Sequence, residues 1–149
     1  KGGIHPNDGK SLAKDKAIVE VLPEGDLVFP LSQHIGAPAA PIVKVGDQVL
    51  KGQKIAEAGG FVSAPVYSSV SGKVKAIAPY FTPTGGKVSS IIVENDGAYT
   101  EAERLSTRPL EMLSKEEILN LIAEAGIVGM GGAGFPTRVK TFTEGTGKD

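Results

Sequence analysis

The stretch Val43–Ala58 reads VKVGDQVLKGQKIAEA, and Ser63–Ile77 reads SAPVYSSVSGKVKAI. In the first stretch, short β-type runs flank glycine turns at Gly46 and Gly52; in the second, a Ser-Gly-Lys turn is centred on Gly72. Short strands at close spacing, separated by glycine turns, are typical of a small β-sandwich or barrel. The two stretches together therefore predict two interlocking β-hammerhead motifs.

The same pattern extends on both sides of this pair. Between Ala17 and Asn95 we expect strands in IVEV, LVF, PIVKV, KIAEA, APVYSSV, KVKAI and KVSSIIVE, and turns in PEGD, VGDQ, KGQ, AGG, SGK and TGG. We therefore predict a mainly β protein with a C-terminal α segment. Its parts are a β domain over residues 1–95, a linker over 96–113, and a helix with a glycine-rich loop over 114–149.

The sequence SKEEILNLIAEAG predicts a helix over Lys115–Ala125. Ser114 is a candidate N-cap, and Glu117 follows it at capping-box spacing. Gly126 is placed to end the helix in the left-handed conformation. One apolar stripe, by which the helix should pack, has the spacing i, i+3, i+4, i+7: Ile118, Leu121, Ile122 and Ala125.

The composition excludes several classes of function. A net charge of -1 and only 5% aromatic residues argue against nucleic-acid partners. With no cysteine, the chain holds no disulfide, no thiol nucleophile and no cysteine-ligated cluster, and two histidines are too few for a typical zinc site. No run approaches the roughly 20 apolar residues that span a bilayer, so we expect no direct membrane insertion. The chain starts at Lys1 without an initiator methionine, which suggests a processed protein or an excised fragment.

The order of a GD-x-V-x-x-GQ element, an Ala-Pro pair and an SGKV turn resembles the biotinyl/lipoyl family. That resemblance implies a barrel-sandwich hybrid fold. Carriers of the family bear a lysine at the tip of the hairpin between the two halves. Here the tip reads Gly59-Gly60, and no lysine occurs from Ile55 to Gly72. Because a swinging arm needs an exposed amine on this turn, we expect no covalent biotin or lipoate.

A similar hairpin pattern occurs in sugar-phosphotransferase carrier domains, where a histidine accepts a phosphoryl group. His34, in PLSQHIGAPAAP, is the candidate for this alternative. Such an imidazole usually needs a second histidine or a carboxylate to orient it, and His5 is distant in the sequence. A loop histidine hydrogen-bonded to backbone is the simpler interpretation of His34.

Near the carboxyl end, Gly129–Lys140 reads GMGGAGFPTRVK. Clustered glycines allow positive φ and leave N–H groups unshielded, and successive N–H groups can form a nest for an anion. We expect a helix that starts with Pro136 at its first position, with Arg138 and Lys140 supplying positive charge. The formal G-x-G-x-x-G match is weak evidence for a dinucleotide site, because a helix rather than a strand precedes it. A glycine-rich linker with tight backbone packing is the alternative.

The same loop is similar to the flavin loop of the NADH-oxidising subunit of respiratory complex I, with the pattern G-x-G-G-A-G-F-P-T-x-x-K. Further stretches narrow the match: KGGIHP, PLSQHIGAPA, VKVGDQVLKGQ, AEAGGFVSAPVYSSVSGKV, IIVENDG and AGIVGMGGAGFPT. From about Gly2 to Lys140, the chain resembles the N-terminal part of the C subunit of the Rnf ion-translocating electron-transport complex.

This resemblance implies a peripheral subunit on the cytoplasmic side of the bacterial inner membrane. In that family the subunit exchanges electrons with NAD(H) through FMN and passes them to two [4Fe-4S] clusters. The complex is an oxidoreductase and translocase that couples ferredoxin and NAD to Na⁺ or H⁺ transport, so the partners implied are its other subunits and NAD(H). The role of holding FMN carries over to the residues that match the loop pattern: Gly129, Gly131, Gly132, Ala133, Gly134 and Lys140. Met130 stands where the complex I pattern often has arginine, so no charge role is carried to that position.

The family's chain continues through the rest of the flavin domain to cysteine motifs that this sequence lacks. We therefore expect an N-terminal piece with only the start of an α/β flavin-binding domain. By itself it should be inactive and without bound cofactor, and loosely packed from about Gly129. The tail after Lys140, TFTEGTGKD, does not match the expected continuation. The alternative function is a non-enzymatic docking module that binds a partner subunit.

Overall fold

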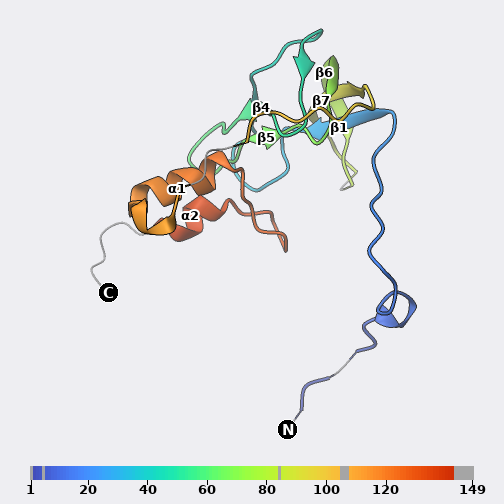
Figure 1. Ribbon diagram of the computed structural model, residues 1–149, viewed down its shortest axis with the longest axis vertical. Coiled ribbons are helices and arrows are strands. Elements are labelled where there is room, and N and C mark those ends of the chain that lie inside the picture. Colours follow the sequence, from blue (N-terminus) through green and yellow to red (C-terminus); the bar gives the residue numbers. More distant parts are fainter. Residues whose placement is uncertain (1, 5, 84, 105–107, 143–149) are drawn as a thin grey trace.

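The structure is a computed structural model of the 149-residue chain, and it describes residues 2–4, 6–83, 85–104 and 108–142. A β domain packs against a pair of α-helices that lie side by side, and the amino-terminal segment runs away from both (Figure 1). The elements follow in this order: η1 (Lys10–Leu12), β1 (Asp26–Pro30), β2 (Ala40–Pro41), β3 (Gln48–Val49), β4 (Lys54–Glu57), β5 (Val66–Tyr67), β6 (Gly72–Phe81), β7 (Lys87–Asn95), η2 (Leu110–Met112), α1 (Lys115–Glu124) and α2 (Thr137–Thr141).

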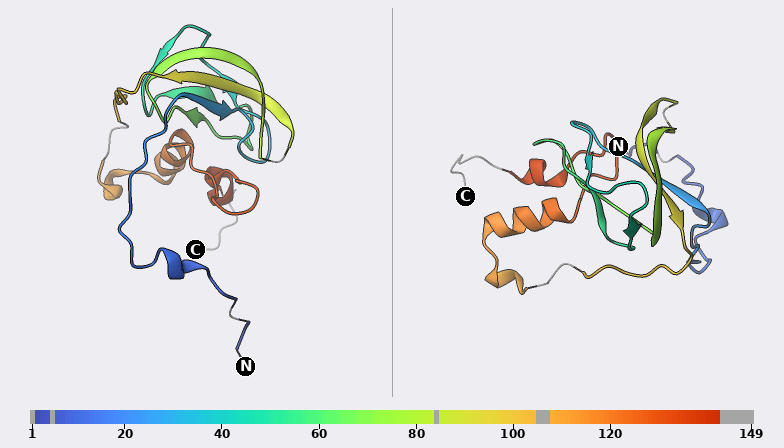
Figure 2. Two further views of the ribbon diagram at one scale, coloured as in Figure 1. Left: turned by 90° about the vertical axis from the view of Figure 1, so that its right-hand side faces the viewer. Right: turned by 90° about the horizontal axis from the view of Figure 1, so that it is seen from above.

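Two antiparallel sheets form the β domain. The larger has the strand order β1-β7-β6-β3, and the smaller has the order β2-β4-β5. The strands β6 and β7 pair over their full length, with a register shift between Val74 and Ala76. Such a shift strengthens the local twist, and Figure 2 shows that the long strands are strongly curled. The mainly β architecture predicted from the sequence is therefore confirmed.

Both sheets contribute inward side chains to one core. Period-2 alternation is clear in β7, where Ile91 and Val93 are completely buried while Ile92 between them is only partly buried. The core cluster consists of these residues: Phe29, Leu31, Ala39, Val43, Val49, Ile55, Ala56, Val66, Val70, Val74, Ile91 and Val93. The strands and turns of Val43–Ala58 and Ser63–Ile77 thus contribute to one continuous apolar core.

The strand predictions differ from the structure in several places. The runs LVF, KIAEA, KVKAI and KVSSIIVE correspond to β1, β4, β6 and β7. By contrast, PIVKV contributes only Pro41 to β2, and APVYSSV contributes only the two residues of β5. Two turn predictions are wrong in part, because Gln48 in VGDQ belongs to β3 and Gly72 in SGK begins β6. The strand predicted in IVEV is also wrong: Ile18–Val21 forms no strand, and Ile18 is 100% exposed. Its β-propensity is real, but no neighbouring strand of the described chain pairs with it.

The predicted helix is confirmed as α1, with Ala125 as its C-cap. Ser114 Oγ accepts a hydrogen bond from the Glu117 N–H, and the Glu117 carboxylate accepts one from the Ser114 N–H, which completes the capping box. Gly126 follows with φ of +64°, the left-handed conformation expected at a helix end. The apolar stripe of α1 is only half-buried, since no residue of the helix is fully buried.

Residues 96–102, which we assigned to the linker, lie against the β domain. The Lys51 N–H donates to the Thr100 carbonyl at 2.9 Å, and the Ala102 N–H donates to the Lys51 carbonyl at 2.8 Å. This short parallel pairing holds the start of the connecting segment beside β3 and β4.

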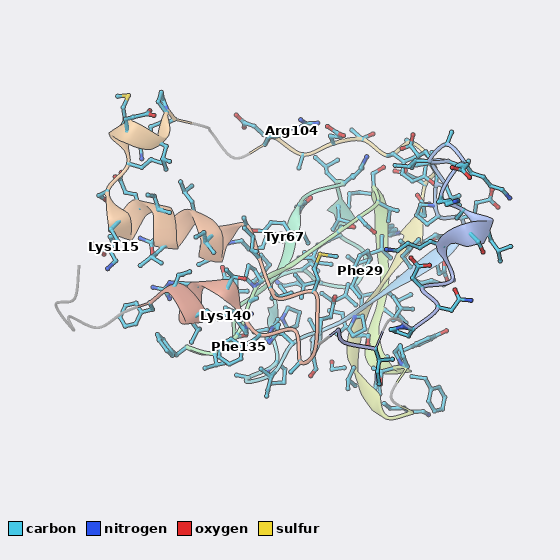
Figure 3. The ribbon with its side chains drawn as sticks, turned by 90° about the horizontal axis from the view of Figure 1, so that it is seen from below. Phe29, Tyr67, Arg104, Lys115, Phe135 and Lys140 are labelled. Carbon is cyan, nitrogen blue, oxygen red and sulfur yellow. The ribbon has the colours of Figure 1, made fainter. Side chains whose placement is uncertain are left out.

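The carboxyl end of α1 packs on the smaller sheet. The Tyr67 hydroxyl donates to the Glu124 carbonyl, and Lys54 Nζ donates to the Glu124 carboxylate. A Cβ on Gly126 would lie 3.2 Å from the Tyr67 ring, so the chain leaves the helix in close contact with the sheet. Figure 3 shows Tyr67 at this junction.

Candidate functional site

The glycine loop lies at the tip of a short turn that joins α1 to α2. The Gly129 N–H donates to the Phe135 carbonyl at 2.9 Å, which closes the base of the loop. Below it, the Thr137 N–H donates to the Ile127 carbonyl at 3.0 Å. Two chain segments that enter and leave the loop are therefore held together by backbone hydrogen bonds.

The expectation of loose packing from about Gly129 is wrong for Pro136, whereas residues 130–133 and 140–142 are exposed. Pro136 is fully buried, and it forms an antiparallel bridge with Val128. Most of the unmatched tail, residues 143–149, lies outside the described residues.

The backbone conformation alternates along the loop. The φ angle is +67° at Gly132 and +60° at Gly134, whereas neither Gly131 nor Ala133 has a positive φ. Alternation of this kind turns successive N–H groups toward one side and creates an anion-binding concavity. Among the described residues, no backbone or side-chain acceptor takes the N–H groups of residues 130–133. The loop thus presents free amide donors.

Lys140, on α2, folds back toward the glycine loop. A Cβ on Gly129 would lie 2.9 Å from Lys140 Nζ, so the ammonium group lies directly beside this glycine. The same Nζ lies 5.8 Å from the centroid of the Phe135 ring, within cation–π range. Figure 3 shows Phe135 and Lys140 on neighbouring parts of the chain at this site. Of the predicted glycines, the structure thus places Gly129 beside the predicted lysine, whereas the nearest atoms to a Cβ on Gly134 belong to Gln33 and His34.

Two details of the predicted site differ in the structure. Pro136 is the N-cap of α2 rather than its first residue, and the helix has only five residues. Arg138 lines a separate cavity of about 400 Å³ together with Phe61 and α1 residues, and it does not line the hollow beside the glycine loop. Its Nε is buried and has no hydrogen-bond partner within the described part of the chain. Lys140 does not line that hollow either, but its Nζ lies beside Gly129 at the base of the loop.

The glycine loop packs on a loop of the β domain that sequence analysis did not assign to the site. The Ile35 N–H donates to the Ala133 carbonyl at 3.0 Å. A Cβ on Gly134 would lie 3.0 Å from the Gln33 carbonyl oxygen. The two segments line one hollow between them. The sequence drew attention to the PLSQHIGAPA motif only through the family resemblance. It did not predict the contact, because no local pattern relates residues so distant in the chain.

The hairpin tip that carries lysine in swinging-arm domains is closed by packing. A Cβ on Gly59 would lie 2.0 Å from the Pro38 carbonyl oxygen. The Gly59 N–H donates to Ser63 Oγ at 2.9 Å, and that hydroxyl donates to the Ala37 carbonyl at 2.8 Å. The tip has neither an amine nor room for a long side chain, which argues against a covalent arm.

His34 is a buried structural histidine in this fold. Its Nε2 lies 3.0 Å from the Ala64 nitrogen and accepts that N–H, and its Nδ1 lies 3.1 Å from the Ile35 carbonyl oxygen. Nε2 also lies 3.2 Å from the Ala64 carbonyl oxygen. We assign the tautomer with the proton on Nδ1, in which Nε2 accepts the Ala64 N–H and Nδ1 donates to the Ile35 carbonyl. With both nitrogens engaged and the residue 8% exposed, the geometry disfavours a phosphoryl-accepting role. His5 lies outside the described residues.

The described residues offer neither a metal centre nor a membrane span. No group of three or more His, Cys, Asp or Glu side chains that could hold a metal ion occurs among them. Within the same residues, every helix is too short or too polar to cross a membrane.

Comparison with known families supports the fold. Residues 1–98 match the family model described as the RnfC barrel sandwich hybrid domain. This match covers the β domain and ends just after β7, so the prediction of a barrel-sandwich hybrid is confirmed.

Curated relatives match nearly the whole chain. The C subunit of the proton-translocating ferredoxin:NAD(+) oxidoreductase complex of Clostridium ljungdahlii is 50% identical, over 94% of this chain and 31% of the relative. The C subunit of the Na(+)-translocating complex of Acetobacterium woodii is 43% identical, over 94% of this chain and 32% of the relative. The C subunit of the ion-translocating oxidoreductase complex of Rhodobacter capsulatus is 45% identical, over 94% and 27%. The chain thus spans about a third of the length of these relatives. On the family match and these similarities together, the chain belongs to the family of Rnf complex C subunits.

Proposed function

We propose that this chain is the N-terminal part of a longer C subunit and that its glycine loop holds the phosphate of FMN. The observation that carries the proposal is a loop whose N–H groups at residues 130–133 are free within the described chain and whose first glycine, Gly129, lies beside the Lys140 ammonium. The residues proposed to bind the cofactor are these: Gly129, Gly131, Gly132, Ala133, Gly134 and Lys140.

The loop suits a phosphate better than a neutral ligand. Amides in an alternating conformation converge on one side and favour an anion, and an adjacent ammonium adds a charge-assisted hydrogen bond. Gly129 contributes differently from the other glycines: its N–H donates to the Phe135 carbonyl, and the Lys140 ammonium lies beside it. A Cβ on Gly131 would meet no atom within 4 Å, and its N–H donates to no acceptor among the described residues.

The residues present fit the phosphate end of FMN. We propose that the side chains that enclose the flavin ring lie in the part of the subunit that follows. FMN, when bound, would supply hydride exchange with NAD(H) and single-electron release toward iron–sulfur clusters held elsewhere in the subunit. The role of this chain is to bind and orient the phosphate. We assign it no catalytic residue and no metal ligand. The names of its relatives place them in ion-translocating oxidoreductase complexes, and we propose a peripheral, cytoplasmic position in such a complex with its other subunits as partners.

The test uses the full-length C subunit in which these residues occur. Lys140→Ala should weaken FMN binding by about tenfold or more, the range expected for losing a hydrogen bond to a charged group. Gly131→Ala should also weaken it, and a Cβ there meets no other atom within 4 Å, so folding is preserved. Lys73→Ala, an exposed lysine on β6, is the matched control and should leave FMN content unchanged. Normal FMN content in both loop variants would refute the assignment.

A second function, docking of a partner subunit by the β domain, is favoured by the exposed amino-terminal segment. Ile18, Val19 and Val21 are at least 78% exposed and extend from the sheet without a partner strand in the described chain (Figure 1). An extended apolar segment of this kind can add to the sheet edge of another protein. Replacing the three residues with serine should release partner subunits from the purified complex while FMN content stays normal. If the variant complex retains all of its subunits, this segment is excluded as the docking site.

A further inference from the structure

The base of the glycine loop is closed by its own backbone hydrogen bonds, and a loop of the β domain supports its tip. We define the support loop as residues 31–36. Its Ile35 N–H donates to the Ala133 carbonyl, the residue between the two positive-φ glycines. Because the C=O and N–H of a trans peptide point in opposite directions, this bond also fixes the direction of the Gly134 N–H. The β domain therefore sets the orientation of one peptide plane in the proposed phosphate site.

A close backbone approach makes this contact specific. A Cβ on Gly134 would lie 3.0 Å from the Gln33 carbonyl oxygen and 3.3 Å from His34 Cα, and φ at Gly134 is +60°. Any side chain at this position would meet backbone atoms and a strained conformation together. Glycine at 134 thus serves the contact with the support loop.

The support loop is held at its first residue by β7 and, just beyond its last residue, by the segment between β4 and β5. The Leu31 N–H donates to the Ser89 carbonyl on β7 at 2.9 Å, and the Leu31 carbonyl accepts from Ala39 at 2.8 Å. At the other end, the Ala37 N–H donates to the Val62 carbonyl at 2.9 Å. The middle of the support loop is held by the hydrogen bonds of one side chain.

That side chain is His34, whose ring reaches from the support loop to Ala64 across the domain. Its Nε2 accepts the Ala64 N–H at 3.0 Å and its Nδ1 lies 3.1 Å from the Ile35 carbonyl oxygen. The ring thus holds Ile35 by its carbonyl, while the N–H of Ile35 holds Ala133. His34 is linked to the glycine loop through one residue, and both of its ring nitrogens are engaged within the β domain.

We propose that His34 is a positioning residue for the phosphate site: through Ile35 it fixes the glycine loop in the conformation that grips the FMN phosphate. The inference rests on the proposed function, since it assigns a support to the same site. It predicts that loss of the His34 hydrogen bonds impairs recognition of the phosphate group rather than of the flavin ring.

The test measures the affinities of FMN and of riboflavin, which lacks the phosphate, for the deflavinated full-length subunit. Removing both ring hydrogen bonds with His34→Leu should reduce the preference for FMN over riboflavin by about tenfold, because amide donors to the phosphate are misaligned. His34→Gln can still accept the Ala64 N–H, so it should retain the preference within about twofold. Gly134→Ala disrupts the same contact between the two loops from the glycine-loop side. It should reduce the preference for FMN by about as much as His34→Leu does.

Two controls separate positioning from general damage and from failure of the site itself. Val70→Ala, a core change in the β domain, should lower stability and leave the FMN preference unchanged. Lys140→Ala should lower the preference by removing the phosphate's direct partner. If Lys140→Ala lowers it and His34→Leu does not, the positioning role is refuted while the phosphate site stands. If neither variant changes it, the proposed phosphate site is refuted as well.

Discussion

The β domain and the helical segment that follows it are stabilised in different ways. In the β domain Ile55, Val70, Ile91 and Val93 have no exposed surface. In the helical segment, residues 108–142, Pro136 is the one buried residue. The first region is held by an apolar core, and the second is held by backbone bonds, a helix cap and contacts with the first.

This difference explains why the loop that carries the proposed site depends on the β domain. The apolar face of α1 is half-covered, so hydrophobic burial stabilises this segment little. Its order comes from defined anchors at Ile35, Tyr67 and Lys54. We therefore expect core changes to unfold the whole chain, and anchor changes to release the helical segment while the β domain remains folded.

The largest effect should come from the core. Ile55→Ala removes a completely buried side chain from β4 and should destabilise the chain by about 2–5 kcal/mol, since it leaves a cavity. Urea denaturation followed by circular dichroism measures this change. The matched control is Ile18→Ala at a fully exposed position, where the expected change is close to zero. Equal effects at the two sites would contradict the core assignment.

A smaller effect should come from a glycine at the end of the support loop. Gly36 has φ of +105°, and a Cβ there would lie 2.1 Å from the Val62 carbonyl oxygen. Gly46 has a similar φ of +97° with open space around it. Gly46→Ala should cost about 1–2 kcal/mol of conformational strain, and Gly36→Ala should cost more because of the added overlap. Thermal melts of the two variants test this order.

The helix cap should affect the helical segment alone. Ser114→Ala should cost about 1 kcal/mol by leaving helix N–H groups without a partner. Hydrogen exchange should show faster exchange in α1 and unchanged exchange in β6 and β7. Faster exchange throughout the chain would instead show that the two regions unfold as one unit.

Acid should weaken the same cap. The hydrogen bond from Arg108, followed by those from Ser114, lowers the pKa of Glu117 to about 2 from its usual 4.5. A lowered pKa means that the stabilisation is present above pH 4.5 and is lost as the pH falls toward 2. The protection factors of the α1 amides, which correct for the intrinsic pH dependence of exchange, should fall across this window. Glu117→Gln should abolish the pH dependence, and its persistence in that variant would assign it to another group.

The smallest effect should come from the ion pair that joins the two regions. The hydrogen bond to Glu124 raises the pKa of Lys54, so its contribution is present below pH 10.5 and is lost as the pH rises past the folded-state value. Lys54→Met should cost less than about 1 kcal/mol, as is usual for partly exposed pairs, and only α1 exchange should change. Lys75→Met removes a comparable pair with Asp26 inside the β domain and should leave α1 unaffected.

Local features of the chain were predictable from the sequence to the extent that neighbours in sequence determine them. The capping box, the Gly126 helix end and the strands β1, β4, β6 and β7 all rest on side chains within a few positions of each other. Ile18–Val21 shows the limit of this reasoning. Its residues favour a strand, yet a strand forms only where a second strand supplies hydrogen bonds.

The sequence by itself determined the β-domain class, the capped helix and the residues of the glycine loop, because short-range propensity and turn chemistry are local. Only the tertiary structure decided that Lys140 returns to Gly129, that Ile35 holds Ala133, and that Pro38 closes the hairpin tip at Gly59. Those contacts depend on how the curled sheets place distant segments side by side, and burial of a shared apolar core, rather than any local pattern, drives that placement.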